Sequence, residues 1–269
     1  MPAAPEVKPS TTAAAEAPKP TVEDKPKPSA PATSEPAAPS TGGSGESDVL
    51  KAIGCKEGLN AKAPNGKIWI GDSGSKTQFT FTNDADEDSA VLCWDFSTMF
   101  DVKNKAIISV PVGAGKSITL SVAPGFSGGC GPAYKDSGFH NPSGVLNESI
   151  LEFTTAPETP SMYVTGVYDI SKEINMDGVV ISATGNRQCT SGVKDGAVSC
   201  LFGCVGGAKT CEKTGTYGIT AGNDASGMCN IGVDTAGNGG ASGGCQFDPE
   251  GDHLKVTYSN SRSWPSATY

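Results

Sequence analysis

The sequence contains no long hydrophobic run and very few histidines, and both shortages limit what the protein can be. No stretch of eighteen apolar residues occurs in the 269-residue chain, so the sequence predicts no membrane span. His140 and His253 are its two histidines. A nucleophilic triad places a histidine beside a reactive serine or cysteine, and neither histidine stands in such a pattern.

Basic residues are also in the minority. The chain has 20 Lys and Arg against 29 Asp and Glu, which gives a formal net charge of −9. Proteins that bind nucleic acid carry a basic footprint on the phosphate backbone, so we expect no nucleic-acid partner. An acidic surface is compatible with neutral or cationic ligands.

Large apolar side chains are nearly absent from residues 1–48, which hold ten of the nineteen prolines. Such a segment cannot form a core and is predicted to be disordered or polyproline-like. It fits an O-glycosylated stalk, and a passive linker remains an equal alternative. We expect an N-terminal extension over residues 49–76, one domain over 77–260 and a short tail over 261–269.

Short alternating segments dominate the remainder and predict an all-β fold. Residues 78–82, 117–122 and 253–258 alternate apolar with polar side chains, as half-buried strands do. Further strands are expected at 67–70, 91–96, 106–112, 150–155, 163–170 and 179–182, and only 47–53 looks helical, with one turn near 224–229. Many short strands at close spacing indicate a β-sandwich or barrel.

Cysteine is concentrated where apolar residues are scarce. Six of the nine cysteines lie between Cys189 and Cys245, in a Gly-rich stretch without alternation. Because such a stretch cannot bury enough apolar surface, we expect residues 184–251 to be a loop subdomain held by disulfides, and the protein to be secreted. A zinc site is the alternative, but zinc prefers closely paired cysteines or histidines.

The order of several short motifs resembles that of the thaumatin-like family, and most of all its small fungal members. A Leu-Glu-Phe strand is followed by a Tyr-Asp-Ile-Ser strand, a methionine and a run of cysteines, and three other strands match in order. The matching segments are Phe79–Asn83, Gly115–Gly125, Leu151–Thr154, Tyr168–Ser171, Met176, Cys189 and Leu254–Tyr258. This resemblance implies an antiparallel β-sandwich beside a disulfide-stapled loop subdomain.

The resemblance also implies disulfide pairs. It pairs Cys189 with Cys245, Cys200 with Cys229 and Cys204 with Cys211. Of the remaining three cysteines, we pair Cys93 with Cys130, which leaves Cys55 free or intermolecular.

Members of that family carry an acidic cleft, and some bind β-1,3-glucan in it. Glu152 and Asp169 match two cleft acids, Glu173 lies beside a third position, and Asp234 corresponds loosely to the last. The family's cleft arginine has no counterpart near Ser127–Gly129. Glycoside hydrolysis needs two carboxyl groups across the bond, and Glu152 and Asp169 are the candidates. Aromatic rings could contact sugar; the candidates are Tyr134, Phe139, Tyr163, Tyr168 and Tyr217.

We therefore expect a secreted, cell-wall-associated protein that binds β-1,3-glucan without strong turnover and uses no cofactor. An extracellular interaction module, such as an effector, adhesin or antigen that binds a host or surface protein, is the first alternative, and a weak endo-β-1,3-glucanase is the second. No signal peptide is visible, so its removal is assumed. Asn147 heads a glycosylation sequon.

Two further patterns resemble ligand loops without matching them. Gly113–Ser117 is similar to part of a phosphate loop, but an alternating strand follows where a helix is required. Asp84, Asp86 and Asp88 alternate as in a calcium loop, yet Ser89 occupies the place of its glycine. We expect a solvated acidic turn at these three residues, with a loose calcium site as the alternative.

Overall fold

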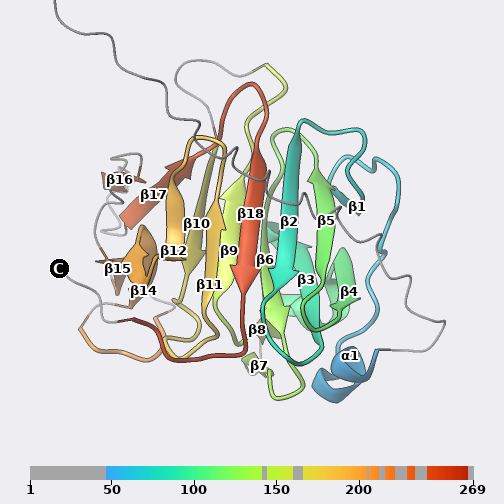
Figure 1. Ribbon diagram of the computed structural model, residues 1–269, viewed down its shortest axis with the longest axis horizontal. Coiled ribbons are helices and arrows are strands. Elements are labelled where there is room, and N and C mark those ends of the chain that lie inside the picture. The colour runs from blue at the N-terminus through green and yellow to red at the C-terminus, as the bar shows by residue number, and fades with distance from the viewer. Residues whose placement is uncertain are drawn as a thin grey trace, which may run out of the picture. The chain divides into compact units, whose positions relative to one another are not determined.

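The computed structural model describes residues 47–140, 144–159, 166–204, 206–211, 216–221, 229–233 and 241–265 (Figure 1). All but the last two residues of the predicted stalk lie outside these ranges, as do the last four residues of the predicted tail and the expected turn at 224–228. None of the helices in these ranges is long and apolar enough to cross a membrane.

Two β-sheets form the body of the protein. In order across the sheet, sheet A consists of β1 (Ile68–Ile70), β5 (Ser117–Val122), β2 (Thr77–Asn83), β18 (His253–Tyr258), β11 (Ile181–Thr184), β12 (Thr190–Lys194) and β13 (Ala197–Ser199). Sheet B runs β15 (Tyr217–Ala221), β14 (Leu201–Cys204), β10 (Val167–Ser171), β9 (Ile150–Thr154), β6 (Ser127–Ala133), β3 (Ser89–Asp95) and β4 (Ile108–Val112). In sheet B, β17 (Ala241–Gln246) also pairs with β10, and β16 (Cys229–Val233) pairs with β17.

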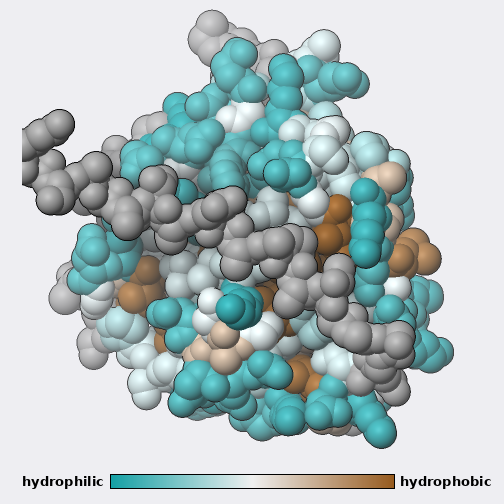
Figure 2. Space-filling view, turned by 45° about the vertical axis from the view of Figure 1, so that its right-hand side comes forward, coloured by the Kyte–Doolittle hydropathy of each residue, from teal (hydrophilic) through white to brown (hydrophobic). Residues whose placement is uncertain are grey.

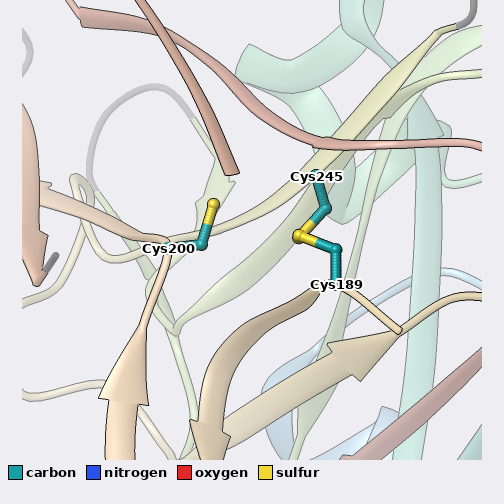
Figure 3. A group of neighbouring side chains, drawn as sticks. All are labelled: Cys189, Cys200 and Cys245. Atoms are coloured by element: carbon teal, nitrogen blue, oxygen red, sulfur yellow. A yellow bond between two sulfur atoms is a disulfide. The ribbon is translucent and has the colours of Figure 1, made fainter. Parts of the chain in front are cut away.

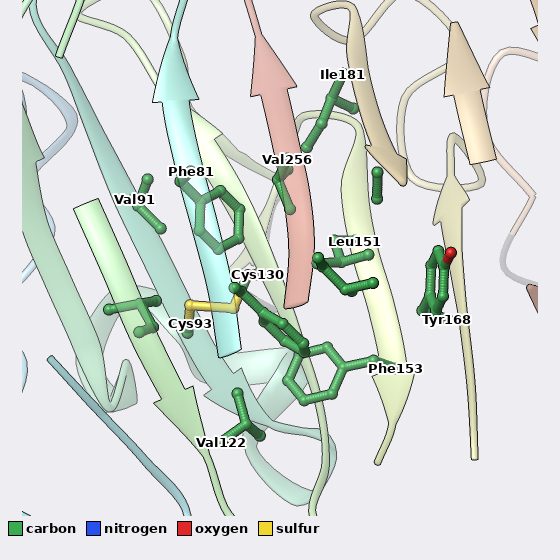
Figure 4. Packing of buried hydrophobic residues seen from close by; sticks show 14 of the residues in the cluster. Phe81, Val91, Cys93, Val122, Cys130, Leu151, Phe153, Tyr168, Ile181 and Val256 are labelled. Carbon is green, nitrogen blue, oxygen red and sulfur yellow. A yellow bond between two sulfur atoms is a disulfide. The ribbon is translucent and has the colours of Figure 1, made fainter. Parts of the chain in front are cut away.

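The two sheets pack face to face, as the alternation in the sequence predicts. Phe79 and Phe81 of β2 are fully buried, and the Phe79 ring meets Phe153 of β9 edge-on with centroids 4.8 Å apart. Side chains from both sheets fill this interior (Figure 4). The fold is therefore the expected β-sandwich. Two strand pairs depart from the expected antiparallel arrangement: β2 with β18, and β10 with β14, are parallel.

A second, smaller core lies on the outer face of sheet B. The short helix α1 (Asp48–Ile53) places Val49 and Leu50 against Leu92 and Trp94 of β3. The turns η1 (Phe96–Asp101) and α2 (Val102–Lys105), with the small hairpin β7 (Phe139–His140) and β8 (Val145–Leu146), border this cluster. The helix expected at 47–53 is present, and its burial explains why so short a helix is stable.

Residues 184–251 differ from the loop subdomain expected for them. Their described parts form β12 to β17, which extend both sheets. The sequence shows no alternation here because backbone hydrogen bonds and disulfides, rather than side-chain packing, hold these glycine-rich strands. Strand β6 was not predicted because it also lacks alternation: Ser127–Ala133 contains three glycines and a proline.

Four disulfides cross-link the sandwich: Cys93–Cys130, Cys189–Cys245, Cys200–Cys229 and Cys204–Cys211. These are the pairs proposed from the sequence. Cys55 is a buried free thiol, and burial raises its pKa to about 11. Such a thiol reacts poorly, which fits a structural role better than an intermolecular bridge.

The C-terminal segment is fixed to the body by a buried ion pair. Glu148 is completely buried and accepts hydrogen bonds from both terminal nitrogens of Arg262, each at 2.7 Å. Ser137 and the backbone N–H of Val179 donate to the same carboxylate. Next to this pair, the Lys172 ammonium lies 4.3 Å from the centroid of the Trp264 ring.

Candidate functional site

The site begins with two acids that face each other on neighbouring strands of sheet B. Glu152 of β9 and Asp169 of β10 are direct partners in the antiparallel ladder. Because Tyr168 and Phe153 on the alternate positions point into the core, the two acids project from the outer face. Direct partners have Cβ atoms about 4.5–5.5 Å apart, so the carboxyl groups can contact the same ligand.

Glycines flank this pair on both sides. Gly129 of β6 is the partner of Glu152 on its other side. Beyond Asp169 lies Gly244 of β17, where an added Cβ would be 3.2 Å from the Cβ of Asp169. The neighbouring positions on both sides of the acid pair therefore carry no side chain of their own.

A third acid joins the pair from the chain after β10. Glu173 is half-buried and follows Ser171 by two residues. Burial, followed by the charge of Glu152, raises the pKa of Glu173 to about 8. Burial likewise raises the pKa of Glu152 to about 7, although a hydrogen bond from Ser171 opposes this.

Asp169 is the most perturbed of the three acids. Burial, and then the charges of Glu152 and Glu173, raise its pKa well above the usual range for an aspartate. Its Oδ1 atom is buried without a hydrogen-bond partner. Buried polar atoms are nearly always paired, so this oxygen is suited to receive a donor from a ligand.

A tryptophan that the sequence analysis did not single out completes the row. Trp94 of β3 is the direct partner of Gly129 and is completely buried. Its indole lies over the glycine, since a Cβ added there would be 2.7 Å from Cζ2 and 3.0 Å from Nε1. Within a continuous apolar strand, no local signal distinguishes this residue from the core residues around it.

Among the described residues, the three carboxyl groups are not part of a cluster whose ligand atoms converge closely enough for a metal ion. In the described part of the chain, the sole group of three or more ligating side chains that converge is Cys189, Cys200 and Cys245, whose sulfurs lie within 4.8 Å of one another (Figure 3). All three sulfurs are already bonded in disulfides, whereas metal binding needs free thiolates. The cysteine cluster therefore has the structural role expected from the sequence.

The other predicted site residues are spread over the molecule. Tyr134 and Tyr168 are buried core residues, and Phe139 and Tyr217 are half-buried. Asp234 and Tyr163 lie outside the described residues. Asn147 is half-buried, and the hydroxyl-bearing residue of its sequon, Ser149, is fully buried. Glycosylation at Asn147 remains a prediction.

The two loop-like patterns lie in surface turns, and Asp84, Asp86 and Asp88 are exposed. Residues 113–116 form the tight turn between β4 and β5. Asp88 accepts a hydrogen bond from the backbone N–H of Ala114 in that turn. The described geometry thus agrees with an acidic surface turn.

Comparison with known proteins does not establish a family. No family model matches the chain, and no curated protein matches its sequence. Among solved structures, the protein elicitor MoHrip2 from Magnaporthe oryzae is similar over 68 % of this chain and 98 % of that chain, with 10 % identity and a TM-score of 0.34. A similarity this weak supports no inference about fold or function, and membership of the thaumatin-like family remains a prediction.

Proposed function

We propose that the protein is an extracellular carbohydrate-binding protein that holds β-1,3-glucan against Glu152, Asp169 and Glu173. The observation that carries this proposal is the unpaired, buried Oδ1 of Asp169, in a row of the sheet where the positions on either side of the acid pair are glycines. Sugar hydroxyls both donate and accept hydrogen bonds, so they match acids that retain protons. The four disulfides fit an oxidising, extracellular location.

A polar ligand also suits the surface. The face shown in Figure 2 is mainly hydrophilic, and its hydrophobic residues form small, separate patches. Leu59 and Phe100 are the large hydrophobic side chains that are exposed among the described residues. Protein-binding sites are often larger apolar patches, and the coloured part of this face shows only small ones.

Binding is favoured over hydrolysis by the protonation of the three acids. Hydrolysis requires one protonated and one ionised carboxyl group. The pKa of Glu152 is raised to about 7 and that of Glu173 to about 8, and the pKa of Asp169 is also raised. Below about pH 6 Glu152 and Glu173 are therefore mainly neutral, and the raised pKa of Asp169 acts in the same direction, which disfavours a carboxylate in this row as nucleophile or base. Weak hydrolysis at higher pH is the second candidate, because Glu152 and Asp169 are close enough to act as a pair.

The test is a pull-down of the full chain on insoluble β-1,3-glucan at pH 5, with chitin and cellulose as controls. We expect selective retention on the glucan and its loss in the double variant E152A/D169A. The exposed Glu57 provides a matched control, and E57A should be retained like the wild type.

The same experiment separates the alternatives. Oligosaccharide released at pH 7.5 or above by the wild type, and not by E152Q, would assign the glucanase activity instead. If the wild type is retained on no polymer, the proposal is wrong and a protein partner becomes the leading hypothesis.

A further inference from the structure

Two unpaired polar atoms lie in one row of sheet B. In the described part of the chain, three buried side-chain atoms have no hydrogen-bond partner: Trp94 Nε1, Ser149 Oγ and Asp169 Oδ1. Unpaired buried polar groups are rare in folded proteins and call for an explanation. That two of the three share a row with the acid pair suggests a common cause.

The strand register fixes the order of this row. Trp94 pairs with Gly129, Gly129 with Glu152, and Glu152 with Asp169, across strands β3, β6, β9 and β10. Direct partners project to the same face of a sheet. The Trp94 indole leans over β6, so that Nε1 occupies the place a side chain at position 129 would take.

The two atoms have complementary chemistry. An indole N–H only donates a hydrogen bond, whereas the unpaired Asp169 oxygen can accept one. With strands about 4.8 Å apart, the two strand steps from β6 to β10 place the atoms about 10 Å from each other. One sugar ring with a hydrogen bond at each end spans such a distance.

We propose that the Trp94 indole N–H is the hydrogen-bond donor of the carbohydrate site and, with Asp169, holds one sugar unit across strands β6 and β9. This role rests on the proposed function. It makes Trp94 a ligand-binding residue, although it looks like part of the core. Glu152 lies between the two atoms and is half-exposed, and it can turn aside about its side-chain bonds to admit the sugar.

The chain provides its own controls for a test by NMR. It contains three tryptophans. The indole N–H of Trp69 donates to the carbonyl of Ser73, and that of Trp264 donates to the carbonyl of Gly178, each at 2.8 Å. Only the N–H of Trp94 is without a partner, so a ligand that supplies an acceptor should act on this signal selectively.

The experiment titrates the full ¹⁵N-labelled chain with a soluble β-1,3-linked glucose oligosaccharide and records the three indole N–H signals. We expect the Trp94 signal to move downfield as the site fills, while the Trp69 and Trp264 signals stay in place. Retention on glucan together with an unmoved Trp94 signal would overturn this role and leave the proposed function standing. Absence of any glucan binding would overturn both.

Substitution gives an independent measure. W94F keeps an aromatic ring but removes the N–H, and should weaken oligosaccharide binding about fivefold, as expected for one lost hydrogen bond. W69F removes an equally buried indole N–H from the main core and should bind like the wild type. Equal affinity of folded W94F and W69F for the oligosaccharide would contradict the proposal. If W94F does not fold, the titration of the wild-type protein tests the role of Trp94.

Discussion

At the scale of single residues, Arg262 has a predictable effect on stability. Its guanidinium is the cationic partner of Glu148, whose side chain has no exposure to solvent. Removing one member of a buried ion pair leaves the other charge buried and unpaired, which costs about 3–5 kcal/mol. We expect R262A to lower the free energy of unfolding by about 3 kcal/mol, measured by urea denaturation.

The matched control is an exposed ion pair. Lys209 contacts Asp177 at 2.7 Å, but their side chains are 72 % and 64 % exposed. Exposed ion pairs contribute little to stability, so K209A should lower the free energy of unfolding much less than R262A does. Equal effects of the two substitutions would show that burial of Glu148 does not govern the Arg262 contribution.

The sequence identified some residues of the candidate site and missed others. Glu152 and Asp169 could be selected as a pair because each stands in a recognisable strand motif, and the structure places them side by side. Trp94 could not be selected, because its place in the row depends on how four strands, β3, β6, β9 and β10, pair with one another. Its relation to Gly129 becomes visible only when the sheet is assembled.

At the scale of elements, the packing of the Trp94 indole over β6 depends on the absence of a side chain at Gly129. A Cβ at position 129 would lie 2.7–3.0 Å from three atoms of the Trp94 indole. Overpacking of this kind costs about 1–3 kcal/mol. We expect G129A to be destabilised by that amount in thermal or urea denaturation, and to lose glucan binding.

Gly138 is the control for this substitution. An added Cβ there has no neighbour within 4 Å, so G138A should alter stability by no more than about 0.5 kcal/mol. If G129A were as stable as G138A, the indole would have to lie elsewhere, and the described row would be incorrect.

The elements themselves were predictable where side chains alternate and unpredictable where they do not. Strands β2, β5 and β18 show the periodicity of a half-buried strand, with buried and more exposed positions in turn along β2 and β18. Strand β6 and the segment from β12 to β17 are rich in glycine, so no periodic pattern marks them. Their strand structure arises from pairing with neighbours that are distant in the sequence.

At the scale of the whole molecule, the acid row links stability to pH. The pKa of Glu173 is raised from 4.5 to about 8 and that of Glu152 from 4.5 to about 7. Between these limits the folded state binds more protons than the unfolded state, so the free energy of unfolding falls as pH rises. The contribution of these two acids to the free energy of unfolding is greatest below about pH 4.5. It is lost as the pH rises through about 7–8.

The corresponding measurement is the melting temperature at pH 5 and pH 8. We expect E173Q to melt higher than the wild type at pH 8 and to show a smaller decrease between the two pH values. E57Q removes one acid from an exposed position and should follow the wild type. A wild-type melting temperature that rises from pH 5 to pH 8 in parallel with E173Q would refute this linkage.

The position of β18 has a consequence for how the protein is made. Residues 253–258 form the last strand in the described sequence, yet they lie in the middle of sheet A, between β2 and β11 (Figure 1). Until the ribosome has produced them, β2 lacks one neighbour and the two halves of the sheet have no connecting strand. Folding of this sheet is therefore completed only after residues 253–258 have left the ribosome, long after β2 and β5 have been synthesised.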